Sequence, residues 1–441
     1  MSKWKLSQYT VVSRTESGDA IFHNSFMGAL ALVPAVDFEK IEPYLEQELT
    51  LQDLENSTLA KLCQNLFFMP IEIDERKLVM ELLNKESESN DFDIIIMPHE
   101  NCNFRCVYCY ETHQRGRMDT WVVESLKRFV KDKTAMRKNI GVRWFGGEPL
   151  LAVDIIHDLS RSFLASCEQA GVSYWSHLTT NAFLLTPPVF EQLIQDKVTG
   201  YQITLDGPEV CHDTTRILAG GGKTFKTIYN NLLQMQQSEH NFTASLRINF
   251  NDESVPLMEE FFGMISRDFG ADSRFGLYFR PIVKYGGPND DSFKTCDPGI
   301  ANVIEMDLTE KYHTHGYLDK LLKRGLLPHG SICYASKKNS IIVGSDGIVY
   351  KCTVSFEDDN NKVGKLLPDG SLKIDIVRWN EWVCAPYIKN GSCDCCIIYP
   401  ICQGKYCPRT SIINQKPVCA MSRATYSKLA KLAANSMTKF H

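Results

Sequence analysis

Twelve of the chain's 16 cysteines fall in two places, and this clustering restricts the fold more than any other feature. Three lie in residues 102–109, which read CNFRCVYC, and nine lie between residues 333 and 419. Closely spaced thiols either pair as disulfides or bind metal. Disulfide scaffolds are typical of short secreted chains, whereas this chain has 441 residues and begins MSKWKLSQYT, without a signal-peptide pattern. The sequence therefore predicts a cytoplasmic protein whose reduced thiols bind metal.

Apart from its cysteines, the chain has the composition of an ordinary globular protein. Hydrophobic residues make up 44%, charged residues 23%, and the formal net charge is -5. These values exclude disordered and fibrous classes and indicate neither a nucleic acid nor an anionic membrane as a partner. The longest near-continuous apolar stretch, MGALALVPAV at 27–36, is too short to span a bilayer. Four cysteines are scattered singly, and we interpret them as small buried hydrophobic side chains: Cys63, Cys167, Cys211 and Cys296.

Hydrophobic periodicity and turn signals predict three domains, 1–90, 91–325 and 326–441. The first has the pattern of a small α+β domain. Its predicted elements are a hairpin of 9–14 with 20–24 and helices at 37–48, 51–67 and 74–86. The third domain is rich in loops and cysteines, with one predicted hairpin at 340–351.

In the second domain, short apolar strands alternate with amphipathic helices. This alternation is typical of βαβ units, so it predicts a parallel sheet, open or closed into a barrel. Functional residues of such sheets gather at the carboxyl ends of the strands. The predicted strands are 94–98, 142–145, 176–179, 202–205, 245–250 and 276–281. The predicted helices are 119–132, 152–170, 187–195, 224–238, 254–268 and 300–325.

Cys102, Cys106 and Cys109 directly follow the first strand of this sheet, with C-x3-C-x2-C spacing. A short loop can hold three thiolates around one corner of a [4Fe–4S] cube, which leaves one iron open to substrate or cofactor. Electron carriers normally close the cube with four cysteines. A zinc site completed by a distant Cys or His is the alternative that the spacing leaves open.

Together with four further segments in the same order, this loop resembles the signature of the radical S-adenosylmethionine (SAM) enzymes. Residues 145–149, FGGEP, resemble that family's GGEP motif, and 178–182, LTTNA, resemble its TTNG strand, with alanine in place of the glycine. Residues 201–208, YQITLDGP, resemble the SLDGP stretch of the branch that modifies peptides and proteins. Residues 246–249, LRIN, resemble its R-x-N strand.

The resemblance implies an α/β fold, a partial (β/α)6 barrel that binds SAM beside a [4Fe–4S] cluster. Glycines permit close backbone approach, and Glu148 would accept a hydrogen bond from the methionine ammonium. The implied cofactor-binding residues are Gly146, Gly147, Glu148, Thr179, Asn181, Thr204, Arg247 and Asn249. Glu100 and Asp206 are candidate catalytic groups near this region, and each is equally a candidate structural residue.

The cysteine-rich tail resembles the SPASM extension, which holds two auxiliary [4Fe–4S] clusters. The resemblance implies an outer cluster on Cys393, Cys396, Cys402 and Cys419. It implies an inner cluster on Cys333, Cys352 and Cys407. Cys384 or Cys395 can supply the fourth inner ligand, or that position is open to substrate. Two structural zinc ribbons are the alternative for this tail.

The resemblance implies a maturase that cleaves SAM reductively to a 5′-deoxyadenosyl radical and oxidises a ribosomally made precursor peptide, by a thioether or carbon–carbon cross-link. An electron donor such as flavodoxin or ferredoxin would be its partner. Residues 1–90 resemble a winged-helix-like element that binds a leader peptide by strand addition, although a simple packing extension fits equally well. The alternatives are a formylglycine-type sulfatase-maturating enzyme and a non-catalytic metal-binding interaction module.

Overall fold

The computed structural model describes residues 3–86, 90–297, 300–312, 322–384, 393 and 395–438. The chain forms two compact units. The core unit comprises Asn90–Leu318 and Asn339–Trp379, and the terminal unit comprises Met1–Ser89, Asp319–Lys338 and Asn380–His441. Both ends of the chain thus share one unit, and the division into three domains at 90 and 325 stays a prediction.

A ten-stranded sheet forms the centre of the core unit, in the order β13-β12-β10-β9-β8-β6-β14-β15-β16-β17. The strands from β13 to β6 pair in parallel, as predicted. They are β6 (Asp91–His99), β8 (Asn139–Gly146), β9 (Ser173–Thr180), β10 (Val198–Leu205), β12 (Thr243–Phe250) and β13 (Phe275–Pro281). This arrangement confirms the predicted α/β fold with a partial (β/α)6 barrel.

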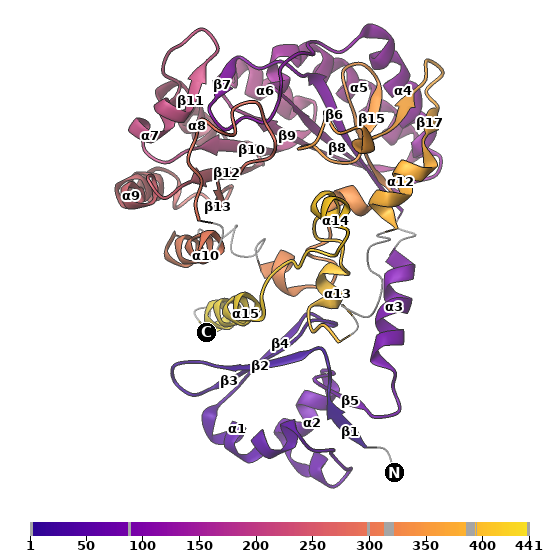
Figure 1. Cartoon of the computed structure of the whole chain (residues 1–441), viewed down its shortest axis with the longest axis vertical. Helices are drawn as coiled ribbons and strands as arrows, with labels where there is room; N and C mark the ends of the chain where they lie inside the picture. The colour runs from indigo at the N-terminus through magenta and orange to yellow at the C-terminus, as the bar shows by residue number, and fades with distance from the viewer. Residues whose placement is uncertain are drawn as a thin grey trace. The chain divides into compact units, whose positions relative to one another are not determined.

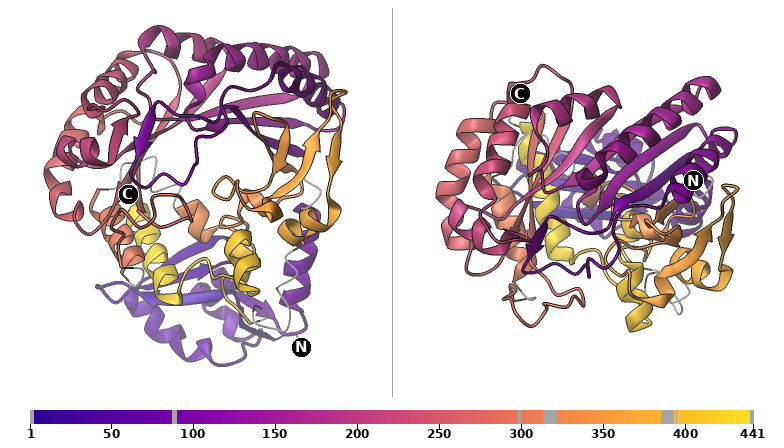
Figure 2. Two further views of the ribbon diagram at one scale, coloured as in Figure 1. Left: turned by 45° about the horizontal axis from the view of Figure 1, so that its top comes forward. Right: turned by 90° about the horizontal axis from the view of Figure 1, so that it is seen from above.

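Helices connect these parallel strands along the outer face of the curved sheet (Figures 1 and 2). They are α4 (Thr120–Thr134), α5 (Val153–Ala170), α6 (Pro187–Gln195), α8 (Phe225–Gln237) and α9 (Met258–Phe269). Each lies where an amphipathic pattern predicted it, because one apolar face is buried against the strands. The predicted helix at 300–325 begins as α10 (Ala301–Tyr312), and residues 313–321 lie outside the described part of the chain.

The tail adds an extension to this sheet that the sequence did not predict. The expected hairpin is present as β14 (Ser340–Val343) and β15 (Ile348–Tyr350), and β16 (Lys362–Leu366) and β17 (Leu372–Ile374) follow it. Strand β14 pairs in parallel with β6, so β6 is an interior strand. Its run of apolar residues from 94 to 97 agrees with that position, because an interior strand is buried on both faces.

The terminal unit contains a three-stranded antiparallel sheet in the order β2-β3-β4. Its strands are β2 (Thr10–Arg14), β3 (Ala20–Asn24) and β4 (Ala29–Val33). The predicted hairpin is β2 with β3, whereas β4 was missed because its apolar stretch does not alternate with polar residues. The short strands β1 (Trp4–Leu6) and β5 (Phe68–Pro70) pair separately.

Helices complete the terminal unit, and its apolar core lies between the sheet and the first two of them. They are α1 (Ala35–Ile41), α2 (Ser57–Gln64), α3 (Glu75–Glu86), α13 (Tyr399–Cys402), α14 (Pro408–Asn414) and α15 (Arg423–Thr438). Helix α2 is shorter than predicted because the Asn56 side chain caps it, accepting the N–H groups of Thr58 and Leu59. Among the described helices, none is long and apolar enough to cross a bilayer.

Replacing Trp144 tests the packing of the core sheet. Trp144 is fully buried in β8, and its indole N–H donates to the Ser176 hydroxyl at 2.9 Å. We expect Trp144→Ala to lower the free energy of unfolding of the core unit by about 3–5 kcal/mol, because it leaves a large cavity. The matched control is Trp175→Ala on β9, where the ring is 37% exposed, with an expected loss of about 1 kcal/mol. Urea denaturation of both variants measures the difference, and equal losses would contradict this account.

Candidate functional site

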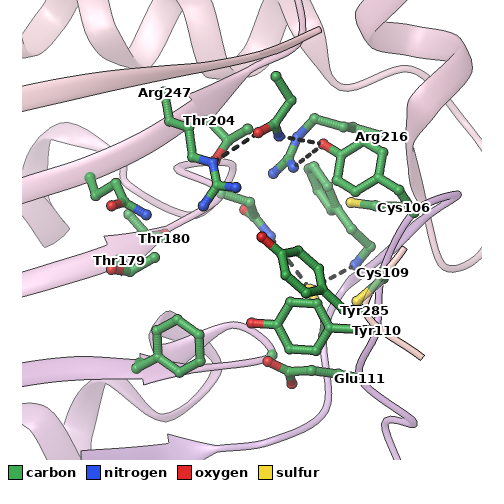
Figure 3. A pocket seen from close by; sticks show the side chains of 18 of the residues that line it. Cys106, Cys109, Tyr110, Glu111, Thr179, Thr180, Thr204, Arg216, Arg247 and Tyr285 are labelled. Atoms are coloured by element: carbon green, nitrogen blue, oxygen red, sulfur yellow. Dashed lines mark hydrogen bonds between the residues drawn. The ribbon is translucent and has the colours of Figure 1, made fainter. Parts of the chain in front are cut away.

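A cavity lies at the carboxyl ends of the parallel strands of the core unit (Figure 3). Open α/β sheets and barrels place their sites at this edge. Cys102, Cys106 and Cys109 all line it. Seven of the eight predicted cofactor-binding residues line it as well: Gly146, Gly147, Thr179, Asn181, Thr204, Arg247 and Asn249.

A short antiparallel pairing holds the cysteine loop. Strand β7 (Phe104–Cys106) pairs with β11 (Arg216–Leu218), which follows the helix α7 (Glu209–Thr215). The Cys102 Sγ accepts the backbone N–H of Phe104 at 3.3 Å and the Asn181 amide at 3.7 Å. Donors of this kind support metal-bound thiolates, because hydrogen bonds to sulfur stabilise their negative charge. The loop therefore offers a donor set suited to an iron–sulfur cluster.

Burial raises the pKa of all three thiols, that of Cys109 to about 12. The thiolate forms therefore need a cation close by. Within the described residues, no three His, Cys, Asp or Glu side chains are grouped as ligands of one metal ion. Assignment of these three cysteines as cluster ligands stays a prediction.

The two glycines of the FGGEP segment are required because backbone carbonyl groups lie where a Cβ atom would be. Gly146 has φ +130°, and a Cβ there would lie 2.3 Å from the carbonyl oxygen of His99. A Cβ on Gly147 would lie 2.5 Å from the carbonyl oxygen of Asn101. The N–H of Gly147 donates to His99 at 3.2 Å, and that of Glu148 donates to Asn101 at 3.1 Å. The end of β8 thus supports the residues that lead into the cysteine loop.

Glu148 is fully buried behind the cavity wall. Its Oε1 accepts the N–H of Leu150 at 3.0 Å and the hydroxyl of Thr180 at 2.8 Å. Its Oε2 accepts the N–H of Asn181 at 2.8 Å. The Glu148 carboxylate thus connects the ends of β8 and β9. Its contact with the methionine ammonium of SAM stays a prediction.

Asp206 anchors a hydrogen-bonded network beneath the cysteine loop. Its carboxylate accepts the Tyr108 hydroxyl at 2.5 Å, the Thr215 hydroxyl at 2.8 Å and the Asn249 amide at 3.2 Å. Tyr108 in turn accepts Arg216 at 3.0 Å. Asp206 is 2% exposed and accepts from three donors, which gives it a structural role, and its catalytic role stays a prediction.

Glu100, the other catalytic candidate, has a structural role as well. Its Oε1 accepts the backbone N–H and the hydroxyl of Ser345, both at 2.7 Å. Its Oε2 accepts the Arg115 guanidinium at 2.6 Å. These contacts connect the end of β6 to the turn between β14 and β15. Glu100 is not among the residues that line the cavity, and its catalytic role stays a prediction.

The cavity wall also contains groups that sequence reasoning missed. Glu111 lines it, and burial, with the neighbouring Glu100 carboxylate, raises the pKa of Glu111 to about 8. Tyr110 and Tyr285 meet edge to face with ring centres 5.6 Å apart (Figure 3). The one available signal for Glu111 and Tyr110 was their place directly after Cys109. Tyr285 lies in a loop after β13 and had no signal.

In the terminal unit, three of the cysteines predicted for the outer cluster lie close enough to the fourth, Cys402, to affect its pKa. Burial raises the pKa of Cys402 to about 12, and negative charge on Cys396, Cys393 and Cys419 adds to that shift. The Cys402 sulfur also interacts with the backbone N–H of Gly404.

The remaining tail cysteines are divided between the two units. Cys333 and Cys407 belong to the terminal unit, and Cys352 belongs to the core unit. Cys384 and Cys395 are exposed. The inner-cluster assignment therefore stays a prediction.

Comparison with known proteins shows what the part of the chain around this site is similar to. Residues 96–260 match the model of the Radical SAM superfamily. The serine-type anaerobic sulfatase-maturating enzyme of Klebsiella pneumoniae is 23% identical over 346 residues, covering 72% of this chain and 82% of that protein. The GTP 3',8-cyclase of Listeria monocytogenes serovar 1/2a is 25% identical over 332 residues, covering 70% of this chain and 87% of that protein.

A solved structure agrees with the observed fold. Native anSMEcpe with bound AdoMet and Cp18Cys peptide superposes with a TM-score of 0.58 at 19% identity, covering 79% of this chain and 98% of that one. The family match includes all three cysteines of the loop and β8, β9, β10 and β12, which end in the cavity. A non-catalytic metal-binding module is thereby rejected, and over residues 96–260 this enzyme is similar to the Radical SAM superfamily.

Proposed function

We propose that this enzyme oxidises a peptide, forming a thioether or carbon–carbon cross-link in a ribosomally made precursor. One observation carries the proposal: three thiols and the ends of five parallel strands, three of which contribute polar side chains, line a single cavity. Cavities that combine apolar walls with a few convergent polar groups are typical binding sites for small molecules. The relatives support a polypeptide substrate, because one of them matures sulfatases and the solved structure holds a peptide.

Cys102, Cys106 and Cys109 would hold the cluster, and their burial beside N–H donors fits that role. When bound, the [4Fe–4S] cluster and SAM supply the one-electron chemistry that removes a hydrogen atom from a C–H bond. Thr204, Asn181 and Arg247 offer hydrogen-bonding groups to the cofactor from the strand ends. The rings of Tyr110 and Tyr285 shield the cavity from water, which protects reactive intermediates.

The tail would hold two auxiliary clusters, which makes three in all. The charge interactions of Cys402 with Cys393, Cys396 and Cys419 support the outer cluster. Auxiliary clusters fit a net oxidation, because they can accept an electron from the substrate. A flavodoxin or ferredoxin would reduce the enzyme. We infer that the enzyme works in the cytoplasm, because such electron donors and reduced thiols occur there.

The N-terminal residues support a precursor with a leader segment. Strands β2 and β4 are the outer strands of the three-stranded sheet, and Leu32 on β4 is 39% exposed. An extended peptide can add to such an edge through main-chain hydrogen bonds. The winged-helix-like role predicted for this region therefore remains part of the proposal.

A second candidate is a formylglycine-type sulfatase-maturating enzyme. It is favoured by the similarity to the Klebsiella pneumoniae protein, of which 82% is covered. Mass spectrometry of two peptides after anaerobic incubation separates the candidates. A precursor peptide that loses two hydrogen atoms and becomes cross-linked supports the first, and a sulfatase peptide whose Ser or Cys becomes formylglycine supports the second.

Replacing Cys102 tests the assignment of the SAM-binding cluster. We expect Cys102→Ala to abolish formation of 5′-deoxyadenosine after anaerobic reconstitution and reduction, because one of three ligands is lost. Cys63→Ala is the matched control, since that cysteine belongs to the terminal unit and the loop belongs to the core unit. Chromatographic assay of 5′-deoxyadenosine measures both. Cofactor cleavage that survives in Cys102→Ala would show that the assignment is wrong.

Replacing Gly147 tests the support beneath the cysteine loop. A Cβ 2.5 Å from the Asn101 carbonyl must displace the residues that precede Cys102. We expect Gly147→Ala to bind less iron per chain and to lose most 5′-deoxyadenosine formation. Gly263→Ala is the control, because no atom lies within 4 Å of a Cβ there and alanine favours the helix α9. Equal iron content in the two variants would contradict the proposed support.

A further inference from the structure

Arg76, on helix α3, contacts the segment that carries the outer-cluster cysteines. Its Nη1 donates to the backbone carbonyl of Cys393 at 3.0 Å. Its guanidinium lies over the ring of Tyr399, with 4.2 Å from Cζ to the ring centre. Both contacts fall within the terminal unit. A residue of the N-terminal region with a permanent positive charge is therefore hydrogen-bonded to the backbone of a proposed cluster ligand.

Apolar contacts bring the same two regions together. Tyr9, Phe26, Val79 and Tyr399 form one buried cluster, and Cys393 and Cys396 pack against it. Two polar contacts reinforce this packing. The Ser25 hydroxyl donates to the carbonyl of Ile397, and the Tyr399 hydroxyl contacts the Met80 sulfur at 3.5 Å. The N-terminal sheet and α3 thus form one wall of the outer cysteine site.

The charge of Arg76 has a definite electrostatic consequence at this place. An arginine stays protonated at all accessible pH values, so it contributes a fixed charge. The potential of an iron–sulfur cluster depends on nearby charge and hydrogen bonding. Reduction adds a negative charge to the cluster, so a neighbouring cation stabilises the reduced form and raises the reduction potential. Partial burial strengthens the effect, because the effective dielectric constant is lower than in water.

We propose that Arg76 is a positioning residue that orients the Cys393 segment and raises the reduction potential of the outer auxiliary cluster. This inference rests on the proposed function, which places a cluster on Cys393, Cys396, Cys402 and Cys419. The N-terminal α+β region thereby has a redox role in addition to any contact with a leader peptide. Arg76, Tyr9, Phe26 and Val79 of this region pack against the segment that carries the outer-cluster cysteines.

The test is a redox titration of the full reconstituted enzyme, followed by electron paramagnetic resonance. Arg76→Gln removes the charge and keeps an N–H donor, whereas Arg76→Lys keeps the charge. Lys77→Gln is the matched control, because it removes one charge from the next residue of α3, where the side chain is exposed and screened by solvent. Iron content and the melting temperature of each variant show whether the clusters are loaded and the chain is folded.

We expect the outer cluster of Arg76→Gln to titrate at a more negative potential than that of the wild type. Arg76→Lys should keep most of the wild-type potential, and Lys77→Gln should match the wild type. Loss of the outer cluster from Arg76→Gln but not from Arg76→Lys also supports the proposal, because it too shows that the charge is needed.

Two results would overturn the electrostatic role. One is an equal outer-cluster potential in the wild type, Arg76→Gln and Lys77→Gln. The other is loss of the cluster from both Arg76 variants, which would indicate a packing role alone. A wild-type enzyme without an outer cluster would overturn this inference together with that part of the proposed function. That failure is recognised in the wild-type titration, before any variant is compared.

Discussion

The close backbone contact between the ends of β6 and β8 is the constraint on which the site depends. His99 pairs with Gly146 after a shift of register that begins at Ile96. Such an irregularity redirects the chain where regular pairing ends. Only glycine at 146 and 147 lets β8 approach the His99 and Asn101 carbonyls so closely. The direction in which the cysteine loop leaves the sheet follows from this contact.

A second support acts on the other side of the same loop. The buried network of Asp206, Tyr108, Arg216 and Asn249 joins the loop to β10, β11 and β12. Each member has a hydrogen-bonded partner within the network, so the arrangement resists deformation. Since the loop is held from both sides, its backbone is fixed at the edge of the cavity. Preorganisation of this kind is what a precise site requires.

The sequence predicted the barrel well because each parallel strand is a short apolar run followed by an amphipathic helix. It predicted the wall residues of the cavity because they lie in short motifs at strand ends. It could not assign Glu100 and Asp206, since their partners Ser345 and Asn249 are brought close only by the fold. It also missed the composition of the terminal unit, because contacts such as that between Arg76 and Cys393 join residues 317 positions apart.

The buried contact between His23 on β3 and Tyr426 on α15 has a consequence for biosynthesis. A ribosome makes β3 before the core unit and α15 after it, so this face of the N-terminal sheet stays uncovered while the whole core unit is synthesised. Domains generally fold in the order in which they emerge. The core barrel can therefore fold before the terminal unit closes, and insertion of the tail clusters would be a late step of assembly. A nascent chain stalled before residue 423 would expose the sheet and attract chaperones.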